Sequence, residues 1–148
     1  MSLRVRIQID GDRELMNALQ RMGKAGLPAA KKVLKAFTDR VVPQAKAITP
    51  VEPEDGGALR DSVRATRPTL TSRGVLSVGV LAGGAPLAGK VAATHHHYNV
   101  YAVVQHEDLT LRHTDGESKF IEKPFVREAA RVPGELLEAL DDEVKKAM

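Results

Sequence analysis

The segment from Thr49 to Ser62 constrains the fold more than any other part of the sequence. It reads Thr-Pro-Val-Glu-Pro-Glu-Asp-Gly-Gly-Ala-Leu-Arg-Asp-Ser, with two prolines and two adjacent glycines in its first nine residues. Proline disfavours helical geometry in the residue before it, so a helix that arrives from the N-terminal side should end near Ile48. A strand is expected to begin inside the segment, which makes it a helix-to-strand turn.

The residues before this turn have the apolar spacing of a long helix. Pro28 suits the first turn of that helix. Pro43 lies inside it and predicts a kink, because proline removes one backbone hydrogen bond. The apolar stripe consists of Ala30, Val33, Leu34, Phe37, Val41, Ala45 and Ile48. The opposite face carries Lys31, Lys32, Lys35 and Lys46, and is either a solvated face or a surface facing DNA or an acidic neighbouring subunit.

The remaining elements predict an antiparallel sheet. Residues 3–9 alternate between apolar and polar side chains, which indicates a strand, and a short helix should follow from Asp12 to just before Gly23 or Gly26. Further strands are expected over 58–65, 74–80 and 98–105, with 66–73 as a connection. Residues 82–99 are rich in glycine and alanine, which predicts a long mobile loop.

The C-terminal part predicts a second long helix. Residues 106–118 are polar and read as an exposed loop, and 119–124 as a short extended piece. Pro124 should open the last helix, which Pro133 and Gly134 break or bend. The end of this helix is acidic. We therefore predict a single α+β domain over residues 1–148, in which an antiparallel sheet packs against a long kinked helix and a C-terminal helix.

Several kinds of site are disfavoured by composition. The chain has no cysteine, so disulfides and thiolate zinc sites are excluded. His95, His96 and His97 are adjacent, whereas zinc ligands are spaced to converge on one ion, so a polar titratable loop is the preferred interpretation. No serine elbow, phosphate loop or dinucleotide fingerprint is present. We expect no enzymatic activity, no metal, no cofactor and no membrane span.

Two groups of motifs together resemble a known family. The first group is Thr49-Pro50-Val51, Gly57 and Leu59-Arg60-Asp61-Ser62. The second is Tyr101-Ala102, Gln105-His106-Glu107 and Pro124-Phe125 with Ala129. In this order they resemble the head–tail joining or tail-completion minor structural proteins of long-tailed bacteriophages. Gly56-Gly57 stands where the family has Thr-Gly, and His106-Glu107-Asp108 stands where it has Glu-Gly-Thr.

The resemblance implies a structural role in the virion. Such a protein would be a ring component of the neck through which DNA passes, assembled in the host cytoplasm. Its partners would be further copies in a six-fold or twelve-fold ring, the connector and tail tube proteins, and genome DNA by non-specific contact. The shape or interface residues would be Thr49, Pro50, Gly57, Leu59, Arg60, Tyr101, Pro124 and Phe125. The alternatives are a tail terminator that caps the tube and a small nucleic-acid-binding protein.

Overall fold

The computed structural model describes residues 3–5, 23, 25–51, 57–83, 98–113 and 115–148. These residues form an α+β fold, as predicted. Its helices are α2 (Gly26–Ile48), α3 (Ala58–Ser62), α5 (Tyr98–Glu107), α6 (Glu122–Ala129) and α7 (Val132–Ala147). Its strands are β1 (Leu3–Val5), β2 (Arg64–Ala65), β3 (Thr69–Leu70), β4 (Leu76–Ser77) and β5 (Val80–Ala82).

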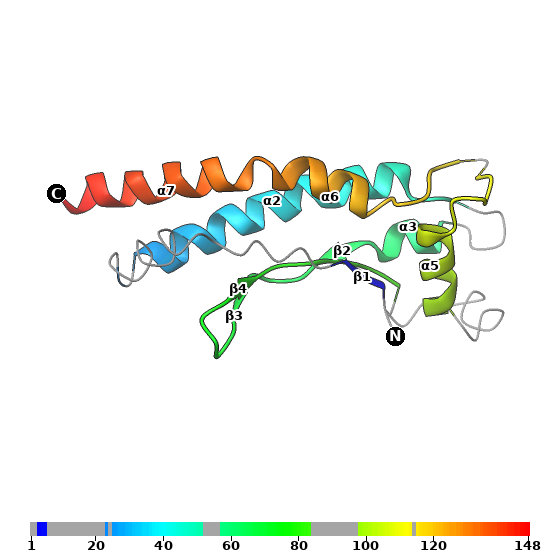
Figure 1. The fold of residues 1–148 in the computed structure, drawn as a ribbon, viewed down its shortest axis with the longest axis horizontal. Coiled ribbons are helices and arrows are strands. Elements are labelled where there is room, and N and C mark those ends of the chain that lie inside the picture. Colours follow the sequence, from blue (N-terminus) through cyan, green and yellow to red (C-terminus); the bar gives the residue numbers. More distant parts are fainter. Residues whose placement is uncertain (1–2, 6–22, 24, 52–56, 84–97, 114) are drawn as a thin grey trace.

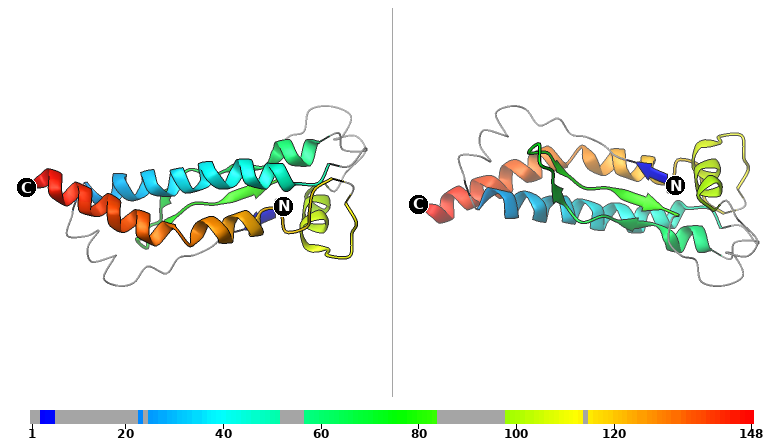
Figure 2. Two further views of the ribbon diagram at one scale, coloured as in Figure 1. Left: turned by 90° about the horizontal axis from the view of Figure 1, so that it is seen from above. Right: turned by 90° about the horizontal axis from the view of Figure 1, so that it is seen from below.

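The molecule is elongated and has two layers (Figure 1). One layer is a pair of helical segments, in which α2 runs in one direction and α6 followed by α7 returns beside it, as both views of Figure 2 also show. The second layer is formed by the strands, which lie across one side of these helices. An edge-to-face contact between Phe37 of α2 and Phe125 of α6, with ring centroids 4.8 Å apart, fixes the two helical segments together.

The strand layer is a bulged hairpin with one added strand. β5 pairs antiparallel with β2 on one side and with β1 on the other, and β3 pairs antiparallel with β4. The register shifts by one residue between the β2–β5 and β3–β4 pairs, so the strand that contains Arg67 and Pro68 carries one extra residue. A bulge suits Pro68, because proline cannot donate to a ladder. Beyond it the hairpin projects away from the helices (Figure 1).

The core lies between the two layers. Alternate residues of the hairpin, Val78, Val80 and Ala82, are buried against α2. They belong to one core with apolar side chains from α2, α3 and α7 and from the residues that flank α3 and α6, which include Val41, Ala45, Leu59, Val63, Phe120, Ile121, Val132 and Leu136. The predicted apolar stripe of the long helix is therefore its core face. The helix continues through Pro43, and the predicted kink stays a prediction.

The end of α2 is confirmed at the predicted residue. Ile48 is the last helical residue, and Thr49 is extended with φ −68° and ψ 129°, as expected for a residue that precedes proline. The predicted break in the C-terminal helix is confirmed as well, since α6 ends at Ala129 and α7 begins at Val132. Pro133 occupies the first turn of α7, where its missing N–H costs nothing.

Three predicted extended segments were wrong. Residues 58–62 of the expected strand 58–65 form the helix α3, and only Arg64–Ala65 form a strand, β2. Residues 98–105 belong to α5, because Ala102, Gln105 and His106 are buried at helical spacing. Residues 119–121 form a turn and α6 already begins at Glu122, so Pro124 lies within its first turn rather than at its start.

Smaller corrections concern the loops. The expected connection 66–73 contains β3, and the expected strand 74–80 is divided between β4 and β5. His106 was assigned to an exposed loop, but it lies in α5 and is fully buried. The short helix after Asp12, the histidine run 95–97 and most of the predicted loop 82–99 lie outside the described residues. Within that loop, Ala82 ends β5 and Tyr98 begins α5.

Candidate functional site

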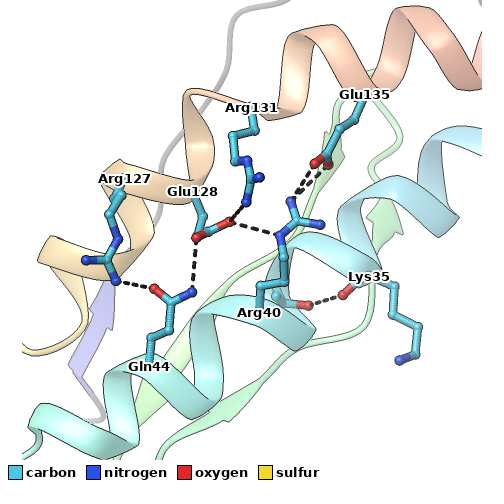
Figure 3. A network of polar contacts seen from close by, with 8 residues as sticks. Lys35, Arg40, Gln44, Arg127, Glu128, Arg131 and Glu135 are labelled. Carbon is cyan, nitrogen blue, oxygen red and sulfur yellow. Dashed lines mark hydrogen bonds and ion pairs between the residues drawn. The ribbon is translucent and has the colours of Figure 1, made fainter.

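A polar joint connects α2 with α6 and α7 (Figure 3). Arg40 Nε donates to Glu128 Oε2 at 2.9 Å, and Arg40 Nη2 donates to both carboxylate oxygens of Glu135 at 2.9 Å. Gln44 Nε2 donates to Glu128 Oε1 at 3.0 Å, and Arg127 donates to the Gln44 side-chain oxygen. A single guanidinium thus binds both C-terminal helices and sets their position along α2.

The centre of this joint is the buried carboxylate of Glu128, which is 7% exposed. Hydrogen bonds from Gln44 and Arg40, with a further one from Arg131, lower its pKa from 4.5 to about 2. A buried carboxylate is costly unless it is paired and hydrogen-bonded. These donors supply that compensation, so the removal of any one of them should destabilise the contact between α2 and the C-terminal helices.

A second joint fixes the turn after α2. The Arg60 guanidinium donates to the Thr49 carbonyl at 3.0 Å and to Asp115 Oδ2 at 2.9 Å. The Thr49 hydroxyl donates back to the Ala45 carbonyl at 2.6 Å. Gly116 has φ +97° and lies so close to Pro50 that an added Cβ would be 2.6 Å from the Pro50 Cα. The loop that carries Asp115 and Gly116 therefore clamps the end of the long helix.

A third cluster surrounds His106. Its ring meets Phe120 edge to face at 5.0 Å, Nδ1 bonds to Glu107 Oε1 at 2.7 Å, and Nε2 accepts the backbone N–H of Glu122 at 3.4 Å. This pattern places the ring proton on Nδ1. Burial lowers the pKa of His106, against the opposing effect of Glu107. The ring is therefore neutral at pH 7.

Three groups of this cluster have the ligand types of a metal site. Ligand atoms of His106, Glu107 and Glu122 lie within 4.8 Å of one another. However, the Lys119 ammonium already bonds to Glu107 and lies 3.1 Å from Glu122 Oε2. It supplies the positive charge that a cation would bring, and His106 Nε2 is engaged by a backbone N–H. The arrangement is best described as an ion-paired junction between α5 and α6.

The predicted shape residues occupy the second joint and the core. Thr49 and Pro50 are buried beside Arg60, and Leu59 is fully buried. Gly57 precedes α3 with φ +88°. Pro124 and Phe125 are buried in α6. Tyr101 lies on α5. The structure thus brings Thr49, Pro50 and Arg60 together, whereas Phe125 contacts α2 elsewhere.

Of the four predicted lysines on α2, two are exposed and two are half-buried. Lys35 pairs with Asp39 one turn further along, and Lys32 is exposed. Lys31 and Lys46 are half-buried. Among the residues that the structure describes, Lys31, Lys32 and Lys46 form no ion pair. The basic residue that does reach the acidic C-terminal helix is Arg40, through Glu135.

Comparison with known families gives a match over residues 13–102, to a family described as "Bacteriophage HK97-gp10, putative tail-component". The match covers more than half of the chain. The chain belongs to this phage family. The matched range includes α2, the turn from Thr49 to Ser62 and the hairpin, but not the Pro124-Phe125 motif. No curated protein and no solved structure matches the chain.

Membership of this family points to a structural, non-enzymatic component of the phage tail and to a place in the virion. It also suggests that the chain contacts other virion proteins. Among the described helices, none is long and apolar enough to cross a membrane.

Sequence reasoning missed the members of both joints other than Thr49, Pro50 and Arg60. A signal for Glu128 was present, because it lies three residues after Phe125 and four before Val132, and therefore on the buried face. A carboxylate at such a position predicts a buried cationic partner. No comparable signal identified Asp115 or Gly116, which contact the turn only because the chain folds back from a distant position.

Proposed function

We propose that this chain is a head–tail joining or tail-completion protein, which forms a homo-oligomeric ring of six-fold or twelve-fold symmetry around the path of the DNA. The observation that carries the proposal is the family match over 13–102. The motifs on which the resemblance rests also include the segment from Thr49 to Ser62, of which Arg60 hydrogen-bonds to Thr49 and to Asp115.

The form of the subunit is suited to a ring wall. The helical layer is long and thin, with α2 along one edge and α6–α7 along the other (Figure 2). We also propose that residues 1–148 act as one domain, because β1 from the beginning of the chain pairs with β5, and α7 from its end packs along α2. The neighbouring layers would be the connector and the tail tube, and the genome would make non-specific contacts within the channel.

The function is tested by removing the protein from an otherwise complete phage. We expect DNA-filled heads and separate tails of normal length in electron micrographs, with particle formation restored by the chain supplied in trans. Tails of uncontrolled length would instead identify a tail terminator. Normal particles that lack the chain, together with DNA binding by the purified protein, would identify a small nucleic-acid-binding protein and overturn the proposal.

A further inference from the structure

An exposed apolar stripe runs along the C-terminal helices on the flank turned away from α2. Its members recur every three or four residues, are all exposed and, except for Asp141, are apolar: Val126, Ala130, Pro133, Leu137, Asp141, Val144 and Met148. Val126 is 56%, Leu137 63% and Val144 44% exposed. At about 100° per residue, the α7 members lie roughly 120–180° around the helix from Glu135, which faces α2. We call this row the α7 flank.

The opposite edge of the helical layer is basic. Lys31, Lys35 and Lys46 lie roughly 120–180° around α2 from Arg40, which faces the C-terminal helices. Figure 3 shows the Lys35 side chain directed away from Arg40 and Glu135. We call these three lysines the α2 flank. The two flanks therefore lie on opposite edges of one two-helix layer.

The two helices have complementary charge. α2 carries five basic residues and one acidic residue, whereas α7 carries five acidic residues and two basic ones. Only one pair joins α2 to α7 within the subunit, that of Arg40 and Glu135, as far as the described residues show. Lysine side chains can lay their aliphatic stems over apolar surface and keep the ammonium in water. The α2 flank can thus cover the α7 flank and place ammonium groups near Asp141, a carboxylate that also pairs with Lys145 of its own helix.

The two flanks also match in position along the molecule. The Arg40–Glu135 ion pair places these two residues at the same height along the helix axes, that is, level with each other. The helices α2 and α7 run antiparallel (Figure 1). Residues equally far before Arg40 and after Glu135 are therefore level, because both helices have the same rise per residue. Lys35 is level with Leu140, and Lys31 with Val144. A neighbour rotated about an axis parallel to the helices keeps these levels.

We infer that a second copy of this chain binds side by side, with its α2 flank on the α7 flank of the first. Because the contact uses two different surfaces on opposite edges, each copy can bind one neighbour on each side, and the series can close into a ring. The inference rests on the proposed function and names its subunit contact. The lysines then face a neighbour rather than the DNA.

Cysteine cross-linking tests this contact, since the chain has no cysteine of its own. Particles are assembled with a full-length chain that carries Lys31→Cys and Val144→Cys, and are treated with a short bis-maleimide. We expect a ladder of covalent dimers, trimers and larger species. The matched control carries Lys31→Cys and Val126→Cys. It uses the same stripe about 27 Å away along the helix, at about 1.5 Å per residue, and should give no ladder.

Several cross-linking results would overturn the contact, the ring or both. Dimers from Val144→Cys alone would show a symmetric contact and overturn the inference, as would equal ladders from the test and control pairs. A lysine-reactive cross-linker applied to particles with the unaltered chain separates the two proposals. Oligomers with that reagent but no ladder from the test pair would overturn only the contact. Monomers with both reagents would overturn the ring and the contact together.

Discussion

Arg40 and Glu128, 88 residues apart in the chain, are joined by a hydrogen bond of 2.9 Å between Nε and Oε2. The bond links the long helix to α6, while the other end of the same guanidinium holds Glu135 of α7. Because the C-terminal segment breaks between α6 and α7, this residue fixes both pieces against one helix. The position of the α7 flank in the molecule depends on it.

Replacing Glu128 with alanine should therefore destabilise the fold by about 2 kcal/mol. Removing one partner of a fully buried pair costs roughly 3–5 kcal/mol, and we expect less here because water reaches the Arg40 side. Arg40 is 31% exposed. Urea unfolding measures the difference. Glu138→Ala, at an exposed position on α7, is the control and should change stability by less than about 0.5 kcal/mol. Equal effects of the two variants would show that the joint contributes nothing.

The same carboxylate should make stability depend on acid pH. Its pKa is lowered from 4.5 to about 2 in the folded protein, so the folded state favours the ionised form. The stabilisation is complete above about pH 4.5 and is lost as the pH falls towards 2. In urea unfolding, the natural chain should have a larger free energy of unfolding than Glu128→Gln above about pH 4.5, and this difference should shrink as the pH falls towards about 2. A constant difference from pH 6 to pH 2.5 would contradict the lowered pKa.

The sequence predicts best what local chemistry decides. The end of α2 could be placed because Pro50 acts on its immediate neighbour, and the break before α7 because Pro133 excludes a helix interior. The apolar stripe of α2 follows from spacing alone, and it became the core face. The α+β class was predictable because alternating apolar residues marked the segments that contain β1, β4 and the start of β5, although two other segments expected as strands, 58–62 and 98–105, are helical.

The wrong predictions arose where tertiary packing overrides local preference. Residues 98–105 contain β-branched and aromatic side chains that favour a strand, yet Ala102, Gln105 and His106 are buried at helical spacing. The polar identity of two of these residues concealed the helix. The sequence also did not predict which residues contact the end of α2. Asp115 and Gly116 reach Thr49 and Pro50 from a segment that is remote in the sequence.

The clamp predicts a graded series of glycine substitutions. Gly57→Ala adds strain alone, because φ is +88° and no atom lies within 4 Å of the new Cβ, and should cost about 1 kcal/mol. Gly116→Ala adds the same kind of strain and a clash with Pro50, and should cost at least about 2 kcal/mol. Gly134→Ala meets nothing within 4 Å on α7 and should be neutral or stabilise by up to about 1 kcal/mol. Thermal unfolding gives the order of the three melting temperatures. Equal melting temperatures of Gly116→Ala and Gly134→Ala would contradict the close approach of Gly116 to Pro50.

The buried ring of His106 should cause a separate loss of stability just below neutral pH. Burial lowers its pKa from 6.5 in the folded state, and Glu107, Lys119 and Glu122 are the charged groups that act on it. Unfolded chains bind a proton there at about pH 6.5, whereas the folded ring resists it. Stability is therefore complete above this pH and falls as the pH decreases towards the lower folded value.

His106→Gln keeps a polar side chain at this position and removes the titration. We expect its melting temperature to fall less between pH 7.5 and pH 5.5 than that of the natural chain. His113→Gln is the matched control, because His113 is only partly buried and bonds to Ser118 outside the Phe120 contact. It measures what the loss of a histidine elsewhere in the fold does to the pH profile. A steep loss that persists in His106→Gln would assign the effect to another group and leave the ring with a packing role alone.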